Sequence, residues 1–292
     1  AVNDAVNGWS SGSAYVYHYD FETEWTRVAK LQPSDGGPFH SFGSSVSITE
    51  DRIVISAPGA DSTNHRSGKV YIFEKPAEGW RDMTETSVIT RVNDEKGKFG
   101  YQVAVANDEI AITQVYEEQS SAVGYAYIFK KEGNLWALKA ELNPYQRTVE
   151  YAASFGYSLA YDGETVVIGS PFAANSNGAV FVFQKFFEGW SQSQTEDALL
   201  TTNDGPFAVG YSVDVYEGQV ISGGLGNGET GNTGAGYIFE KGTAWQNSTA
   251  KAKLIGYTNG EATLGYDVCL TDDFAIVSGT GYLVDHWSFF LF

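Results

Sequence analysis

Short apolar runs rich in Val, Ile, Tyr and Phe follow one another along the chain, and Gly, Asp, Asn or Pro residues separate them. Such runs are typical of β-strands, because a helix would place its apolar residues three or four positions apart. In one stretch the pattern predicts four strands, which we call A, B, C and D: 43–48, 53–57, 69–74 and 80–90. The chain is therefore predicted to be all-β.

The four-strand unit recurs with a period of roughly 55 residues. An apolar residue followed by glycine opens strand A at Phe42-Gly43, Phe99-Gly100, Phe155-Gly156, Val209-Gly210 and Leu264-Gly265. Strand C carries a triplet at Tyr15-Val16-Tyr17, Tyr71-Ile72-Phe73, Tyr127-Ile128-Phe129, Phe181-Val182-Phe183 and Tyr237-Ile238-Phe239. A tryptophan opens strand D at Trp25, Trp80, Trp136, Trp190 and Trp245. Four antiparallel strands repeated at this spacing are typical of the blades of a β-propeller.

We expect one propeller domain over residues 1–292, most simply with five blades closed by N-terminal strands. The repeats span about 42–98, 99–154, 155–208, 209–263 and 264–280, and residues 12–41 would complete the last one. The tail 281–292 is left over. Three places are open to it: pairing at a sheet edge, plugging the channel, or replacing the strand at Tyr15. The alternative is a fragment of a six- or seven-bladed propeller.

Strand A alternates large and small side chains. Val103 and Val105 are examples of the large face, and Ser45 and Ser47 of the small face. Large residues against small ones allow neighbouring blades to interdigitate. Cys269 lies on the small face, so we expect it to be a buried core residue rather than a nucleophile. Asp214 lies on the same face and is expected to border a wet central channel.

The charge of the chain narrows the range of partners. Its 36 acidic and 18 basic residues give a net charge of −18. Nucleic acids and anionic lipids attract basic surfaces, so neither is an expected partner. Each apolar run, including the end 287–292, is shorter than the roughly 20 residues of a membrane-spanning helix. The first residues lack a basic and apolar leader, so we expect that a signal peptide was either absent or removed.

Several short motifs resemble the FG-GAP repeat. Besides the Phe-Gly pairs, they are Ala57-Pro58-Gly59, Ser170-Pro171, Ser34-Asp35-Gly36 and Asn203-Asp204-Gly205. The resemblance covers residues 12–280. FG-GAP repeats build β-propellers in integrin α-subunits and in bacterial and algal surface proteins, so the resemblance implies an extracellular module for adhesion.

The integrin type of repeat also implies calcium, held by a D-x-D-x-D-G loop between strands A and B. Here the A–B turns are two or three residues long, as at Glu50-Asp51 and Asp272-Asp273. A calcium loop needs several oxygen ligands at alternating positions. We therefore expect no bound metal and no other cofactor.

The D–A and B–C loops are long and varied, and in a propeller they share one rim. Varied loops on a rigid scaffold are the usual place for binding. The candidate binding residues of this rim are Asp35, Phe39, His40, His65, Arg66, Asp94, Tyr145, Arg147, Glu150, Asp204 and Phe207. Turn formation is an alternative role for Asp35 and Asp204, and Phe39 and Phe207 could pack beneath their loops.

Three functions are open. The first is a non-enzymatic propeller, secreted or on a cell surface, that recognises protein or glycan through this rim; exposed aromatic residues on several blades would favour glycan. The second is a glycosidase with carboxylates in the central funnel, where strand A carries Asp214 and Asp267. The third is a structural module of a surface assembly, attached through Trp287–Phe292. Asn247-Ser248-Thr249 is a glycosylation sequon, which is compatible with secretion.

Overall fold

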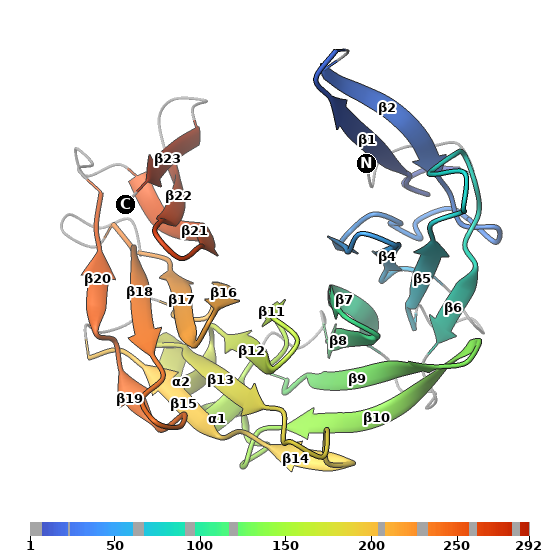
Figure 1. The fold of residues 1–292 in the computed structure, drawn as a ribbon. Coiled ribbons are helices and arrows are strands. Elements are labelled where there is room, and N and C mark those ends of the chain that lie inside the picture. The colour runs from blue at the N-terminus through green and yellow to red at the C-terminus, as the bar shows by residue number, and fades with distance from the viewer. Residues whose placement is uncertain are drawn as a thin grey trace. The chain divides into compact units, whose positions relative to one another are not determined.

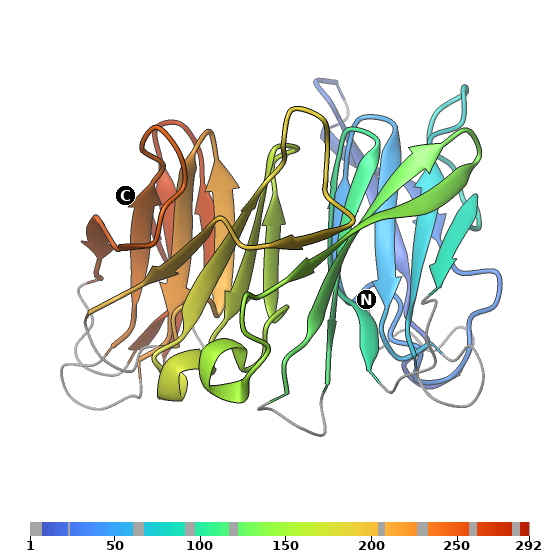
Figure 2. The same cartoon turned by 90° about the horizontal axis from the view of Figure 1, so that it is seen from below.

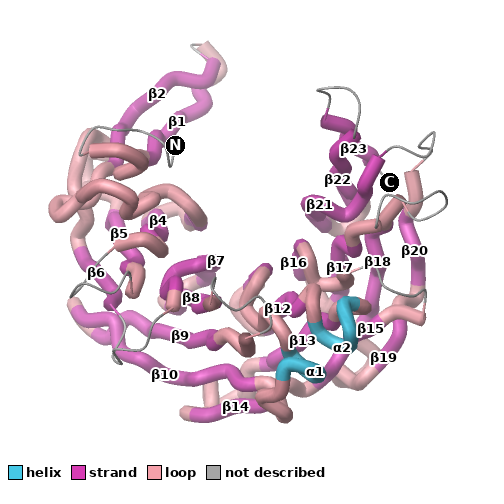
Figure 3. Tube along the Cα trace, turned by 180° about the vertical axis from the view of Figure 1, so that it is seen from behind, coloured by secondary structure: helices cyan, strands magenta, loops and turns pink. Residues whose placement is uncertain are grey.

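The fold was determined as a computed structural model. It describes residues 8–22, 24–60, 67–90, 97–116, 122–203, 208–226, 233–256, 262–281 and 287–291. Strands and loops make up almost all of this part of the chain, with two short helices (Figure 3). The prediction of an all-β protein built from propeller blades is confirmed.

The chain divides into two compact units, Ala1–Gln114 with Lys130–Ala137, and Val115–Phe129 with Leu138–Phe292. The first unit contains β1 (Ala14–Asp20), β2 (Glu24–Leu31), β3 (Val46–Ile48), β4 (Arg52–Ala57), β5 (Lys69–Glu74), β6 (Ser87–Thr90), β7 (Lys98–Ala106) and nearly all of β8 (Glu109–Val115). Two strands, β9 (Tyr125–Glu132) and β10 (Leu135–Asn143), contribute residues to both units.

The second unit holds the remaining elements. They are α1 (Val149–Ala152), β11 (Ser158–Tyr161), β12 (Thr165–Ser170), α2 (Ala173–Ser176), β13 (Ala179–Gln184), β14 (Ser193–Thr195), β15 (Ala198–Thr201), β16 (Ser212–Tyr216), β17 (Gln219–Gly224), β18 (Ala235–Glu240), β19 (Ser248–Thr249), β20 (Ala252–Leu254), β21 (Ala262–Leu270), β22 (Ala275–Gly281) and β23 (Trp287–Leu291).

The predicted strands A to D form antiparallel sheets in sequence order. Examples are β3-β4-β5-β6 in the first unit, and β11-β12-β13-β15 and β16-β17-β18-β20 in the second (Figure 1). Each B strand is buried along nearly its whole length, because it is covered on both faces and paired at both edges. The apolar runs of strand B are therefore continuous, whereas strand A alternates.

Strand D differs from the prediction in one respect, because it is split. Its first part pairs in parallel with strand D of the preceding blade: β14 with β10, and β19 with β15. Only the second part, β15 or β20, completes its own sheet. The split covers the outer edge of each neighbouring sheet, which would otherwise be open to pairing with other chains.

The terminal strands form incomplete sheets. β1 and β2 make a two-stranded sheet, and β21, β22 and β23 make a three-stranded one. The tail pairs with β22, from Ile276 opposite Leu291 to Thr280 opposite Trp287. It therefore takes the place of a C strand, which is one of the three places expected for it. The predicted closure by the N-terminal strands, the single domain and the count of five blades stay predictions.

The turn that opens each A strand joins one blade to the blade before it within each unit. We call it the Phe-Gly turn, although Val209 and Leu264 replace the phenylalanine in two blades. The glycine of each turn has a positive φ, such as +90° at Gly210 and +85° at Gly265. The carbonyl oxygen of Gly210 accepts a hydrogen bond from Ser158 Oγ (2.8 Å), and that of Gly265 accepts one from Ser212 Oγ (3.1 Å). A Cβ on Gly169 would lie 2.0 Å from the Gly210 carbonyl oxygen. The small residues of strands A and B are therefore needed because a neighbouring backbone approaches them.

Large and small faces of strand A interdigitate within each unit, as predicted. Val103 and Val105 are buried, and their amides donate to Ser45 Oγ and Ser47 Oγ of the preceding blade. Cys269 contradicts its prediction, because its side chain is exposed. It lies on the last A strand of the chain, where the described residues of the second unit supply no following blade to cover the small face.

Substitution of Gly169 by alanine tests the close approach. We expect Gly169→Ala to lower the free energy of unfolding by about 3 kcal/mol or more, because its Cβ would overlap a backbone oxygen that cannot move alone. Gly189→Ala is the control: Gly189 has φ +105° but nothing within 4 Å of a new Cβ, so only backbone strain of about 1 kcal/mol applies. Urea unfolding followed by tryptophan fluorescence measures both. Equal losses would contradict the role of the close approach.

Candidate functional site

Three tyrosines, which we call the tyrosine ladder, lie on successive blades of the second unit. Tyr157, Tyr211 and Tyr266 each follow the glycine of a Phe-Gly turn, at the end of strand A where the D–A and B–C loops meet. The ring centroids of Tyr157 and Tyr211 are 5.0 Å apart, and those of Tyr211 and Tyr266 are 5.5 Å apart. The repeated turn thus places one aromatic ring per blade next to the ring of the following blade.

The ladder is open to solvent and continues into a loop. Tyr266 is 42% exposed, and Tyr157 and Tyr211 are half-buried. Phe172, which precedes α2, lies edge-on to Tyr157 at 6.2 Å and is 40% exposed. Figure 2 shows α1 and α2 side by side at this end of the second unit. The result is a row of four aromatic rings with phenol groups among them.

The surroundings of Tyr266, the last tyrosine of the ladder, favour the protonated form of its phenol. The neighbouring Tyr211, partial burial and a hydrogen bond with Tyr211 together raise the pKa of Tyr266, and Asp267 adds to the effect. A protonated phenol donates and accepts hydrogen bonds, while its ring presents an apolar face. The ladder therefore offers both apolar stacking and polar contacts at neutral pH.

Asp214, the acid predicted at the channel, makes a contact between two blades. Its Oδ2 accepts a hydrogen bond from the Leu270 amide (2.8 Å), and its Oδ1 accepts one from the Val215 amide (2.9 Å). Burial raises its pKa, against the effect of these hydrogen bonds. Burial and the charge of Asp214 also raise the pKa of the Cys269 thiol. Both carboxylate oxygens thus hold backbone amides, which is typical of a structural role.

The first unit has a pocket of about 440 Å³ at the same type of strand end. Its lining consists of Ser10, Phe39, Ser41, Ser44, Pro58, Gly59, Lys98, Tyr101 and Gln102. Phe39 is 56% exposed, so its ring does not pack beneath the loop. Phe39 was among the residues expected from the sequence, whereas Tyr101 and Gln102 were not, because the alternation along strand A predicts blade packing for its side chains.

The carboxylate of Asp35 is hydrogen-bonded to two side chains of the first unit. It accepts hydrogen bonds from Tyr71 Oη (2.7 Å) and Lys69 Nζ (2.5 Å). Burial alone would raise the pKa of Asp35, but the hydrogen bonds from Lys69 and Tyr71 outweigh burial and hold that pKa below its usual range. Asp35 therefore connects the D–A loop to strand C.

Arg147 and His40 also hold loops in place. Arg147 donates to the carbonyl oxygens of Val123 and Gly124 and to Asn143 Oδ1, and it lies over the ring of Tyr125 at 4.0 Å. His40 Nδ1 accepts a hydrogen bond from the Gly37 amide at 3.1 Å.

Two further candidates are exposed on the second unit. Tyr145 has a ring that is 73% exposed, while its amide donates to Glu196 Oε2. Glu150 is exposed in the first turn of α1. Asn247 is exposed, and its Oδ1 accepts a hydrogen bond from the Leu199 amide. The candidates that lie outside the described residues are His65, Arg66, Asp94, Asp204 and Phe207. The binding role of all these residues stays a prediction.

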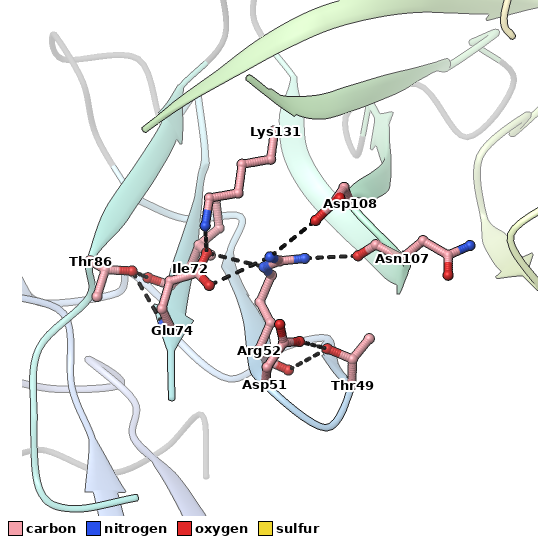
Figure 4. Close-up of polar contacts among 9 residues, drawn as sticks. All are labelled: Thr49, Asp51, Arg52, Ile72, Glu74, Thr86, Asn107, Asp108 and Lys131. Atoms are coloured by element: carbon pink, nitrogen blue, oxygen red, sulfur yellow. Dashed lines mark hydrogen bonds and ion pairs between the residues drawn. The ribbon is translucent and has the colours of Figure 1, made fainter. Parts of the chain in front are cut away.

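The opposite rim of the first unit has a pocket of about 680 Å³, formed by A–B and C–D turns. Beneath it lies the buried Arg52, whose guanidinium donates to Glu74 Oε1 (3.1 Å) and to the Asn107 carbonyl oxygen (2.8 Å) (Figure 4). Arg52 also pairs with Asp108 at 3.5 Å, and Lys131 donates to Glu74 Oε1 at 3.0 Å. These charged groups connect two successive blades, so we assign the cluster to stability.

A hydrolase-like motif is also present in the first unit. Gly8-Trp9-Ser10-Ser11-Gly12 has the G-x-S-x-G spacing of a nucleophile elbow. Such an elbow needs a helix directly after the serine, whereas β1 follows here. Gly12 instead approaches the backbone of Phe42, as the corresponding glycines of later blades approach their Phe-Gly turns. The motif is therefore part of blade packing.

Comparison with known proteins agrees with the turns and sheets described above. The model of the FG-GAP repeat matches residues 25–73 and 150–183. The chain contains FG-GAP repeats. The first matched segment includes Asp35 and Phe39, and the second includes Tyr157 and Phe172. No curated protein matches the chain.

Two features are absent from the described residues. Within that part of the chain, no three His, Cys, Asp or Glu side chains gather as metal ligands would. None of its helices has the length and apolar character needed to cross a membrane.

The Asp35 contact predicts a stability that depends on pH. Asp35→Ala should lower the free energy of unfolding by about 1–3 kcal/mol at pH 7, because it leaves the buried Tyr71 hydroxyl without its acceptor. A lowered folded pKa contributes stability above the unfolded pKa, and this contribution is lost as pH falls through the folded value. The difference from the wild type should therefore shrink between pH 5 and about pH 2. Urea titrations at several pH values test this, and in a Tyr71→Phe background the loss should be smaller. A loss independent of pH would contradict it.

The Arg52 cluster predicts an asymmetry between two glutamates. Glu74→Gln should cost about 2–3 kcal/mol of unfolding free energy, because it removes the main partner of a buried guanidinium. Glu78→Gln is the matched control, since Glu78 pairs with Arg81 in solvent and such pairs contribute about 0–1 kcal/mol. Thermal unfolding by circular dichroism compares the two variants. Similar shifts in Tm would show that the Arg52 cluster is not a stabilising contact between blades.

Proposed function

We propose that this FG-GAP propeller is a non-enzymatic binding module that recognises glycan or protein through the rim formed by its D–A and B–C loops. The observation that carries the proposal is the tyrosine ladder. Its rings recur on successive blades, face solvent in part and combine apolar faces with phenol groups. Exposed aromatic residues with polar neighbours on several blades are the feature that favours glycan over other ligands.

The spacing of the ladder suits an extended ligand. Neighbouring ring centroids are 5.0 and 5.5 Å apart, so a chain of sugar rings or an extended peptide would contact more than one ring. Several moderate contacts on a rigid surface favour binding, because the protein loses little conformational freedom. The Phe-Gly turns supply this rigidity, since Tyr211 and Tyr266 directly follow glycines that are held by the preceding blade.

The glycosidase alternative has less support. Retaining and inverting glycosidases need one carboxylate with a raised pKa that can reach the substrate and a second with a free oxygen. Asp214 has the raised pKa, but both of its oxygens accept backbone amides. Asp267 also accepts a hydrogen bond from a backbone amide, that of Val268.

We also propose a secreted or cell-surface location for this binding module. FG-GAP repeats are typical of surface proteins, and the exposed Asn247 would accept a glycan in a secretory pathway. A structural role in a surface assembly through the tail Trp287–Phe292 is a further proposal. The tail would act through the edge of β23, which pairs with β22.

A glycan array tests the proposal, run in calcium and again in chelator. We expect selective binding of the wild type that chelator does not change. Tyr211→Ala removes the central ring of the ladder and should weaken binding about tenfold, the equivalent of 1–1.5 kcal/mol for one aromatic contact. Tyr17→Ala is the matched control, because Tyr17 is an exposed tyrosine on β1 of the first unit. Binding that survives Tyr211→Ala unchanged would contradict the ladder, and an array without any hit would exclude the glycan form of the proposal.

A further inference from the structure

The pocket at Phe39 opens where the repeat lacks one of its tyrosines. In later blades a tyrosine follows the glycine of the Phe-Gly turn, as Tyr101 does, whereas Ser44 follows the first of these glycines. In the second unit such tyrosines lie beside one another, with ring centroids 5.0 and 5.5 Å apart. A tyrosine in place of Ser44 would by the same geometry lie beside Tyr101, and both residues line the pocket. The serine therefore leaves a cavity of about 440 Å³, which is within the range of sites for small ligands.

Gln102 is a second departure from the repeat at this pocket. The equivalent residue is a serine in three other blades. Two of these serines, Ser158 and Ser212, donate to the glycine carbonyl oxygen of the next turn. A short side chain thus serves the packing of blades at this position, whereas Gln102 brings a side-chain amide to the wall of the pocket.

The side-chain amide of Gln102 is oriented by the preceding blade. Its Oε1 accepts a hydrogen bond from Ser45 Oγ at 3.3 Å. Ser45 Oγ is itself fixed, because it accepts a hydrogen bond from the Val103 amide at 3.1 Å. Gln102 Nε2 donates to none of the described residues, so it is a positioned donor at the wall of the pocket.

The wall of the pocket also supplies an acceptor and an apolar surface. Ser44 Oγ donates to the Ser41 carbonyl oxygen at 2.7 Å, which leaves its lone pairs as acceptors. The apolar surface consists of the exposed ring of Phe39 and the side chain of Pro58. Lys98 also lines the pocket, but it already has an interaction of its own, so it does not decide which ligand fits.

The backbone of Phe39 is strained and firmly held. Its φ of +64° is in the left-handed region, where a residue with a Cβ is disfavoured. The Phe39 amide donates to the Trp9 carbonyl oxygen (2.7 Å), and its own carbonyl oxygen lies where a Cβ on Gly59 would be, at 2.1 Å. Glycine would adopt this conformation without cost, yet the chain has a large apolar side chain there, and its ring is exposed. Strained residues that persist in this way are concentrated at ligand-binding sites.

The donor, the acceptor and the apolar surface match the three parts of an acetamido group. Its carbonyl oxygen needs a donor, which Gln102 Nε2 supplies, and its N–H needs an acceptor, which Ser44 Oγ supplies. Its methyl group needs an apolar surface, which the Phe39 ring offers. A sugar hydroxyl in the same place has no methyl group to remove from water.

We infer that the Phe39 pocket binds one N-acetylated amino sugar, an uncharged pyranose that carries an acetamido group. Gln102 Nε2 donates to the acetamido carbonyl oxygen, Ser44 Oγ accepts its N–H, and the Phe39 ring covers its methyl group. This inference deepens the proposed function and rests on it for the class of ligand, carbohydrate, but it concerns the first unit and uses none of the ladder residues.

The test is a titration of the whole chain with N-acetyl-D-glucosamine and, separately, D-glucose, followed by saturation-transfer NMR. We expect N-acetylglucosamine to bind about tenfold more tightly, because it buries a methyl group and makes an additional hydrogen bond. The strongest transfer should reach its acetamido methyl protons. Added salt should leave the difference unchanged, since both sugars are uncharged. Equal affinities for the two sugars would overturn the inference.

Two substitutions test the pocket itself. Phe39→Gly should abolish saturation transfer to either sugar and keep or raise Tm, because glycine relieves the positive φ. Ser44→Tyr should also abolish the transfer, because it restores the tyrosine of the other blades and fills the cavity. Ser191→Tyr is the matched control, since Ser191 is exposed on the second unit. An unchanged affinity in Phe39→Gly or Ser44→Tyr, or the same loss in Ser191→Tyr, would overturn the inference.

A further variant tests the acetamido contact without removing the pocket. Gln102→Glu keeps the oxygen that accepts from Ser45 and replaces the donor with an anionic acceptor. It should weaken N-acetylglucosamine binding about tenfold and leave glucose binding nearly unchanged, because a sugar hydroxyl can donate to the carboxylate instead. Gln192→Glu is the matched control, since Gln192 is exposed on the second unit and the variant has the same net charge. Equal weakening of both sugars, or the same effect from Gln192→Glu, would overturn the assignment.

The ladder variant separates this inference from the proposed function. Tyr211→Ala should leave N-acetylglucosamine binding unchanged, and a loss would overturn the pocket as its site. Array binding that depends on Tyr211, together with no N-acetylglucosamine binding, would overturn the pocket alone. An array without any hit, together with N-acetylglucosamine binding that requires Phe39, would support the pocket and count against the ladder.

Discussion

The close approach of one backbone to the next is the constraint on which the structure of each unit depends. The carbonyl oxygens of Gly210 and Gly265 enter the preceding blade at a serine and a glycine, and a Cβ on that glycine would overlap the oxygen. The turn glycine itself needs a positive φ to present its oxygen. A serine on strand A, a glycine on strand B and the glycine of the next turn must therefore occur together. This requirement repeats once per blade, which sets the period of the sequence.

The same turn positions the candidate binding surface. Because Tyr211 and Tyr266 directly follow these glycines, the contact that holds the blades also aligns their rings, and the ring of Tyr211 lies beside that of Tyr157. Several loop residues that attract attention in the sequence, such as Asp35 and Arg147, are used to fasten their loops. Binding is thus better supported by side chains at strand ends than by the charged loop residues.

Stability and binding have opposite requirements at Phe39. A glycine would fit its backbone conformation, and a smaller side chain would expose less apolar surface. Arg52 is the opposite case: its buried charge is fully surrounded by partners, so it contributes to the contact between blades and is not available to a ligand. Arg52 thus marks the rim of the A–B and C–D turns as structural, whereas Phe39 lies on the rim of the D–A and B–C loops that we propose for binding.

The repeat, the strand order and the all-β class could be read from the sequence, because blade packing requires the same residues at the same place in each blade. Phe39 was also recognisable as a loop candidate. The exposure of Cys269 and the split of strand D could not be predicted, and the sequence left three places open to the tail, since each outcome depends on which neighbouring strand is present. The tyrosine ladder could not be recognised from the sequence for a related reason. The alternation of large and small residues along strand A is the same whether the next blade buries an aromatic side chain or leaves it in contact with solvent. Local pattern therefore determined the blades, while only the tertiary structure decided which of their aromatic side chains are available for binding.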